Sequence, residues 1–126
     1  MNSNWNWTTI IIFCCVAVVF LLLKRSGQIS AKDALAHLKN GALVIDVRSP
    51  GEFSSSHLTN AINLPLDEIE TALPQRVKDK NQVLLLHCAS GMRSGMAKSK
   101  LKGMGYTNAF NLGSYGRAEK IVNGKN

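Results

Sequence analysis

A single cysteine at the end of an apolar run is the residue of this chain best placed for chemistry. Residues 83–101 read VLLLHCASGMRSGMAKSKL, so Cys88 follows an apolar run and His87, and four residues separate it from Arg93. The thiolate is the reactive form of cysteine, and a helix N-terminus is one of the few places that stabilises it. The pattern therefore predicts a nucleophilic Cys88 where a buried strand ends and a helix begins.

The residues after Cys88 are suited to holding an anion. Gly91 permits backbone torsions closed to other residues, so successive N–H groups can turn inward as an anion-binding nest. The helix that starts near Arg93 adds the positive end of its dipole, and Arg93 adds a full charge. We expect this cradle to lower the pKa of Cys88 and to hold a second negative group against it.

The elements around this loop follow an alternating pattern of strands and helices. Nearly continuous apolar runs are typical of strands buried on both faces of a parallel sheet. The expected strands cover residues 42–47, 61–64, 82–87 and 108–112. The expected helices cover residues 30–40, 65–74 and 93–103, with a short one within 115–122. The pattern predicts an α/β domain with a mainly parallel central sheet flanked by helices.

Ligands of such folds bind beyond the carboxyl ends of the strands. Cys88 lies at one such end, and the segment from Asp46 to Arg48 lies at another. Arg48 could attract an anion, or Asp46, Arg48 and Glu52 could tie the end of the strand to its loop through an ion pair, and the second role is the one we expect. His57 is expected to pack and to form hydrogen bonds rather than to act as a base.

The first 23 residues carry no charged side chain. From Trp5 to Leu23 a helix would be about 28 Å long at about 1.5 Å per residue, close to the roughly 30 Å hydrocarbon core of a bilayer. Lys24 and Arg25 would lie at the second interface. The alternative is a cleaved signal peptide, which requires its positive charge before the apolar run rather than after it. We therefore expect one transmembrane helix that places residues 5–23 in the membrane.

The expected organisation is an N-terminal transmembrane anchor over residues 1–25 and a folded domain over residues 26–126. The positive-inside rule predicts a single-pass protein of the inner membrane whose domain faces the cytoplasm. In that compartment Cys88 would stay reduced. Cys14 and Cys15 fall inside the apolar segment, where cysteine behaves as a small hydrophobic residue.

The charge balance is basic, with 15 Lys and Arg against 8 Asp and Glu and a formal charge of +7. A basic surface of this kind suits anionic lipid headgroups and can attract a small anionic substrate. Low aromatic content and the absence of a zinc-finger pattern argue against nucleic acid as a partner. His57, His87 and Cys88 lack the spacing of zinc ligands, so we expect no metal site.

Two separated motifs resemble those of the rhodanese-like sulfurtransferases. HCASGMRS (87–94) is similar to the active-site loop of that family, and DVRSPGEFSSSHLTNAINLP (46–65) is similar to its upstream signature. The resemblance covers roughly residues 28–116 and implies a rhodanese-like domain.

The resemblance also implies a function. Cys88 would accept sulfane sulfur from thiosulfate or a similar donor as a persulfide, and would pass it to cyanide or to a small or protein thiol. No metal or organic cofactor is implied. Arg48 could help to attract the donor, and the loop would supply the backbone donors around the sulfur. The implied substrate-binding residues of the loop are Ala89, Ser90, Gly91, Met92, Arg93 and Ser94.

Two other functions use the same features. Cdc25-like phosphatases and arsenate reductases have a related scaffold with one more residue between cysteine and arginine, which makes room for a tetrahedral phosphate. The loop length here fits the smaller persulfide, although His87 also occurs in the phosphatases. A non-catalytic module tethered at the membrane is the third hypothesis, and the presence of Cys88, Gly91 and Arg93 together argues against it.

Overall fold

The computed structural model describes residues 5–124 and builds their folded part around one parallel sheet. The strand order is β2-β1-β3-β4, and all three neighbouring pairs are parallel. The strands are β1 (Leu43–Asp46), β2 (Ile62–Asn63), β3 (Leu84–Cys88) and β4 (Ala109–Ser114). The predicted parallel sheet is confirmed, and each predicted strand is present with ends that differ by one or two residues.

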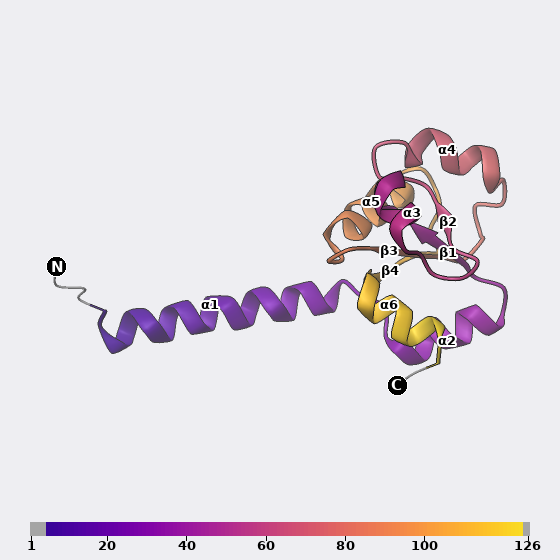
Figure 1. The fold of residues 1–126 in the computed structure, drawn as a ribbon. Helices are drawn as coiled ribbons and strands as arrows, with labels where there is room; N and C mark the ends of the chain where they lie inside the picture. Colours follow the sequence, from indigo (N-terminus) through magenta and orange to yellow (C-terminus); the bar gives the residue numbers. More distant parts are fainter. Residues whose placement is uncertain (1–4, 125–126) are drawn as a thin grey trace.

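Helices cover both faces of the sheet (Figure 1). On one face, α2 (Ala31–Lys39) and α6 (Tyr115–Val122) enclose a core that includes buried Ala34 and Ile121. On the other face, α4 (Ile69–Arg76) and α5 (Met92–Gly103) enclose a second core around the buried side chains Leu73 and Leu101. The sheet is therefore buried on both sides, which explains why its strands read as unbroken apolar runs.

One short helix, α3 (Pro50–Ser55), was not predicted. It begins with a capping box, in which the backbone N–H of Glu52 donates to Ser49 Oγ and the backbone N–H of Ser49 donates to Glu52 Oε1, both at 3.3 Å. Pro50 occupies the first turn, where its missing N–H costs nothing. The capping box that marks this helix was visible in the sequence as the spacing of Ser49 and Glu52.

The predicted bounds of α4 were wrong at both ends. The chain makes a turn first, closed by a hydrogen bond from Glu68 N–H to Pro65 O at 2.9 Å, so the helix begins at Ile69. It also continues past Pro74, which was expected to end it. Proline removes one backbone donor, but the last turn is still closed by Val77 N–H donating to Leu73 O at 2.8 Å.

A long helix, α1 (Trp7–Ser26), precedes the domain and extends away from it in Figure 1. Its apolar side chains from Trp7 to Leu23 are exposed. The helix begins two residues later than predicted, so Trp7 to Leu23 rises only about 25 Å, less than the roughly 30 Å of a bilayer core. Within residues 5–124, no helix is both long and apolar enough to cross a membrane. The predicted transmembrane anchor is therefore not supported.

Parts of the predicted anchor and of the predicted domain lie outside the described residues. The first four residues of the expected anchor lie outside the described residues, and so do the side chains of Lys24 and Arg25, which were expected at the second interface. The last two residues of the expected domain also lie outside them.

Candidate active site

The carboxyl ends of β1 and β3 meet at one edge of the sheet. The two strands are neighbours, and Asp46 pairs with His87 in their register. Because parallel strands end at the same edge, Cys88 at the end of β3 lies beside the segment that follows β1. The sheet thus brings together the two motifs, whose residues Asp46 and His87 lie 41 positions apart in the sequence.

The loop after Cys88 folds back around the cysteine sulfur. The backbone N–H of Gly91 donates to Cys88 Sγ at 3.0 Å, and that of Ser94 donates to it at 3.4 Å. The Ser94 hydroxyl lies 3.5 Å from the same sulfur. Gly91 makes this turn possible because its φ of 94° is left-handed, and it is also the residue that caps α5. The first turn of α5 therefore points its backbone donors at the nucleophile.

The electrostatics of Cys88 result from two opposing effects. Burial is the largest influence and by itself would raise the pKa of the thiol, since the side chain is fully buried. Hydrogen bonds from the Ser94 hydroxyl and from the backbone N–H groups of Ser94, Ser90 and Gly91 lower it. Together these hydrogen bonds outweigh burial, so the pKa of Cys88 lies below its ordinary value of 9.0. A thiolate is the form that attacks sulfur.

Asn111 of β4 holds the loop from behind and was missed in the sequence. Its Nδ2 donates to Gly91 O at 3.0 Å, while its Oδ1 accepts from the Ser94 hydroxyl at 2.7 Å and from Gly113 N–H at 2.9 Å. The register between β3 and β4 shifts at this point, so that Leu86 of β3 pairs with Asn111 and the next residue, His87, pairs with Gly113. A buried polar residue within an apolar strand was the available signal, because buried amides require partners.

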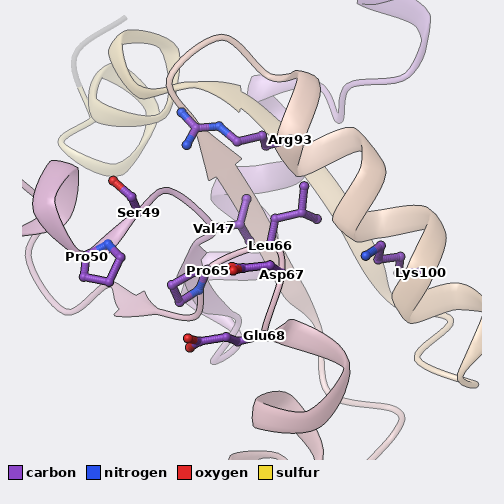
Figure 2. Close-up of a pocket in the computed structure, with 9 residues that line it drawn as sticks. All are labelled: Val47, Ser49, Pro50, Pro65, Leu66, Asp67, Glu68, Arg93 and Lys100. Carbon is purple, nitrogen blue, oxygen red and sulfur yellow. The ribbon is translucent and has the colours of Figure 1, made fainter.

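Arg93 turns away from the loop toward α3. Its Nη1 and Nη2 donate to the two carboxylate oxygens of Glu52 at 2.7 and 3.0 Å. Figure 2 shows its guanidinium extending toward the segment that carries Ser49, above a cavity of about 410 Å³. Asp67 and Glu68 line the same cavity. The positive charge expected beside Cys88 is thus shared with a carboxylate.

Arg48 is buried in the other ion pair of the site. Its Nη2 donates to Asp46 Oδ2 at 2.7 Å and to Ser56 O at 2.7 Å, and its guanidinium carbon lies 4.6 Å from the centre of the Tyr115 ring. The Asp46 carboxylate, the Ser56 carbonyl and the Tyr115 ring surround the buried guanidinium and compensate for its loss of solvent. Arg48 therefore ties the end of β1 to the loop after α3 and to the start of α6.

The histidines of the region differ in their surroundings. His87 is fully buried, and neither ring nitrogen has a hydrogen-bond partner among the described residues. Its Nε2 lies 3.7 Å from Asp46 Oδ2. Burial lowers the pKa of His87 and outweighs the opposite effect of Asp46. His57 is exposed, stacks on Phe53 and forms a hydrogen bond from Nδ1 to Phe53 O at 2.8 Å, which fits the packing role expected of it.

The predicted loop residues differ in burial, and Arg93 is intermediate. Gly91 and Ser94 are buried against the sulfur, whereas Ala89, Ser90 and Met92 are exposed. The exposed residues form the outer surface of the loop.

The chain is similar to known proteins in sequence and in fold. A model of the rhodanese-like domain family matches residues 30–116. The chain is 42% identical over 69 residues to the thiosulfate sulfurtransferase PspE of Escherichia coli (strain K12), covering 55% of this chain and 66% of PspE. It is 31% identical over 85 residues to the thiosulfate sulfurtransferase GlpE of Pseudomonas entomophila (strain L48), covering 68% and 76%.

A solved structure of a rhodanese with anions from E. coli has the same fold. It superposes with a TM-score of 0.59 at 38% identity, covering 61% of this chain and 91% of that one. The chain spans less than two thirds of the length of several of the curated relatives that it matches, PspE among them.

Proposed function

This chain belongs to the rhodanese-like domain family, and we propose that it is a sulfurtransferase that carries sulfane sulfur on Cys88. The observation that carries the proposal is the convergence of the Gly91 and Ser94 N–H groups on Cys88 Sγ at 3.0 and 3.4 Å. The names of PspE and GlpE support the reaction class.

The reaction begins with attack of the Cys88 thiolate on the outer sulfur of thiosulfate or a similar donor. The S–S bond of the donor breaks, sulfite leaves with the bonding electron pair, and the enzyme keeps a persulfide of one negative charge. An acceptor thiolate or cyanide then attacks the terminal sulfur. The acceptor leaves with this sulfur as a persulfide or as thiocyanate, and the Cys88 thiolate is regenerated. No electron is gained or lost overall.

The loop donors are suited to both negative states of this cycle. The N–H groups of Gly91 and Ser94 that bind the thiolate can bind the terminal sulfur of the persulfide when it points into the same loop. Such fixed dipoles stabilise an anion without having to reorganise during the reaction. The Ser94 hydroxyl adds a third donor that can rotate toward the sulfur.

Mass spectrometry of the intact chain tests this function. After incubation with thiosulfate and removal of excess reagent, the wild type should gain one sulfur atom, and cyanide should remove it. Cys88→Ser should gain none. The matched control is the double variant Cys14→Ser/Cys15→Ser, which removes the two exposed cysteines of α1 and should gain sulfur normally. A wild type that never gains sulfur would contradict the proposal.

The loop length and the pairing of Arg93 favour this function over phosphoryl chemistry. A phosphatase of related scaffold needs its arginine over a loop long enough for phosphate. Here four residues separate Cys88 from Arg93, and Glu52 holds the guanidinium. We therefore expect no hydrolysis of an aryl phosphate under conditions in which sulfur is transferred.

We also propose that the domain works in the cytoplasm. The support is chemical: Cys88 is a free cysteine, and its cycle requires a reduced thiolate, which reducing compartments maintain. In spheroplasts of a bacterial host, a C-terminal reporter should survive protease added outside. Its degradation while the spheroplasts stay intact would overturn the location.

A further inference from the structure

The carboxylate of Glu52 binds the Arg93 guanidinium, which a donor anion would otherwise bind. Both guanidinium nitrogens that face the carboxylate are engaged, at 2.7 and 3.0 Å, in a two-pronged pair. The side chains are 35% and 37% exposed, so the pair sits at the surface of the site rather than in the core. Paired donors of this kind bind carboxylate strongly and with fixed geometry.

Glu52 is itself held in place, so Arg93 is the partner that must adapt. Glu52 Oε1 accepts from the Ser49 backbone N–H at 3.3 Å and from the Ser49 hydroxyl at 3.1 Å, as part of the cap of α3. The hydrogen bond from Arg93 is the largest influence that lowers the pKa of Glu52 to about 2. The carboxylate is therefore ionised at every pH at which the protein would work.

A dianion and this carboxylate compete for the same guanidinium. The hydrogen bond to Glu52 is the largest influence that raises the pKa of Arg93, and the charge of Cys88 adds a smaller effect in the same direction. A donor bound at Cys88 would thus gain from Arg93 only to the extent that Glu52 releases it. Two more carboxylates, Asp67 and Glu68, line the cavity beside Arg93 (Figure 2).

We propose that Glu52 is a specificity-determining residue, which withholds Arg93 from doubly charged donors and favours sulfane-sulfur donors of lower charge. The class of donor that the site suits is an organic persulfide or thiosulfonate rather than inorganic thiosulfate. The inference rests on the proposed function, because it concerns the donor of that same reaction. Glu52 acts through Arg93 and does not touch the reacting atoms.

Glu52→Gln tests the proposal with little disturbance of the fold. Glutamine can still cap α3, but it carries no charge to hold Arg93. Thiosulfate, a dianion, is compared with benzenethiosulfonate, a monoanion from which the thiolate takes the outer sulfur as benzenesulfinate leaves. We expect the KM for thiosulfate to fall about fivefold in Glu52→Gln, and that for benzenethiosulfonate to change by less than about twofold. The kcat values should change little.

Two further variants separate the Arg93 pair from a general effect of charge. Glu68→Gln removes one negative charge from the cavity beside Arg93 but leaves the pair between Arg93 and Glu52 intact, and it should leave both KM values close to those of the wild type. In an Arg93→Gln background, adding Glu52→Gln should no longer lower the KM for thiosulfate, since the guanidinium that it would release is gone. Urea unfolding of each variant checks that the fold is retained.

The outcomes are distinct for this proposal and for the function on which it rests. If the wild type forms no persulfide with either donor, the sulfurtransferase function fails. If it does, but Glu52→Gln leaves the thiosulfate KM unchanged or raises it, the role of Glu52 is wrong. An equal fall in the KM for thiosulfate in Glu68→Gln would also contradict the role of Glu52. The wild type alone should already show a higher kcat/KM for benzenethiosulfonate than for thiosulfate.

Discussion

Ser94 and Asn111 are joined by a 2.7 Å hydrogen bond from the Ser94 hydroxyl to Asn111 Oδ1, behind the cysteine loop. The same hydroxyl lies 3.5 Å from Cys88 Sγ, so its single proton has two possible acceptors. When Cys88 ionises, rotation of the hydroxyl toward sulfur gains an anionic acceptor and gives up a neutral one. A strand residue that does not belong to the loop thereby takes part in setting the charge of the nucleophile.

Ser94→Ala should raise the pKa of Cys88. Burial already pushes that pKa upward, and the hydroxyl of Ser94 is the first of the hydrogen bonds that oppose it. Less thiolate would then be present at neutral pH, and alkylation by iodoacetamide would slow. The measurement is the pH dependence of the alkylation rate. Ser90→Ala, which changes an exposed side chain but keeps the backbone N–H, is the control, and identical profiles for both variants would contradict this role of Ser94.

Gly91→Ala should destabilise the domain by about 1–3 kcal/mol, because a φ of 94° is strained for any residue with a side chain. The added Cβ would also lie 3.1 Å from Gln28 Nε2 and 3.4 Å from Gly113 Cα. Urea unfolding measures the loss. Gly103→Ala is the matched control, since its Cβ would meet nothing within 4 Å, and it should leave stability unchanged or slightly higher. Equal stability of the two variants would refute the strain argument.

The domain should lose stability as the pH falls through about 6.5, the ordinary pKa of His87. Burial lowers the pKa of His87 in the folded state, so between the folded and ordinary values the unfolded chain binds more protons. The unfolding free energy therefore decreases on acidification. Urea titrations at pH 8 and pH 5.5 should show the decrease in the wild type and a smaller one in His87→Phe.

Glu52 does not contribute to that decrease, because its pKa of about 2 keeps it ionised throughout this range. The control is His57→Gln, which alters an exposed imidazole and should keep the pH dependence of the wild type. A His87→Phe variant that is as sensitive to pH as the wild type would assign the effect to another group.

Asp46→Asn should cost roughly 3 kcal/mol of unfolding free energy, because it leaves the buried charge of Arg48 without its partner. The Arg48 and Asp46 side chains are 7% and 0% exposed. For comparison, Glu70→Gln breaks the ion pair between Glu70, which is 58% exposed, and Lys100, which is 39% exposed. This change should cost less than about 1 kcal/mol of unfolding free energy. Urea unfolding of both variants measures the two costs, and equal losses would show that burial does not control the value of the pair.

Much of the fold was predictable from local patterns. The strands were visible as apolar runs because both faces of the sheet are covered, and α2 was visible from its Ser30 cap. The bounds of α4 were not, since the turn at Pro65 leaves a weak periodic signal, whereas α3 was marked by the spacing of Ser49 and Glu52 but was not predicted. The predicted membrane span depended on a helix beginning at Trp5, and the helix begins at Trp7.

The sequence alone determined that Cys88 ends a buried strand, that Gly91 allows the chain to turn after it, and that an α/β sheet carries both. These properties depend on neighbours within a few residues, which the order of amino acids specifies directly. Tertiary structure decided that Glu52 takes the charge of Arg93 and that Asn111 holds Ser94, because these partners lie 41 and 17 residues apart. Side chains so distant in the chain meet only once the strand order has placed their elements side by side.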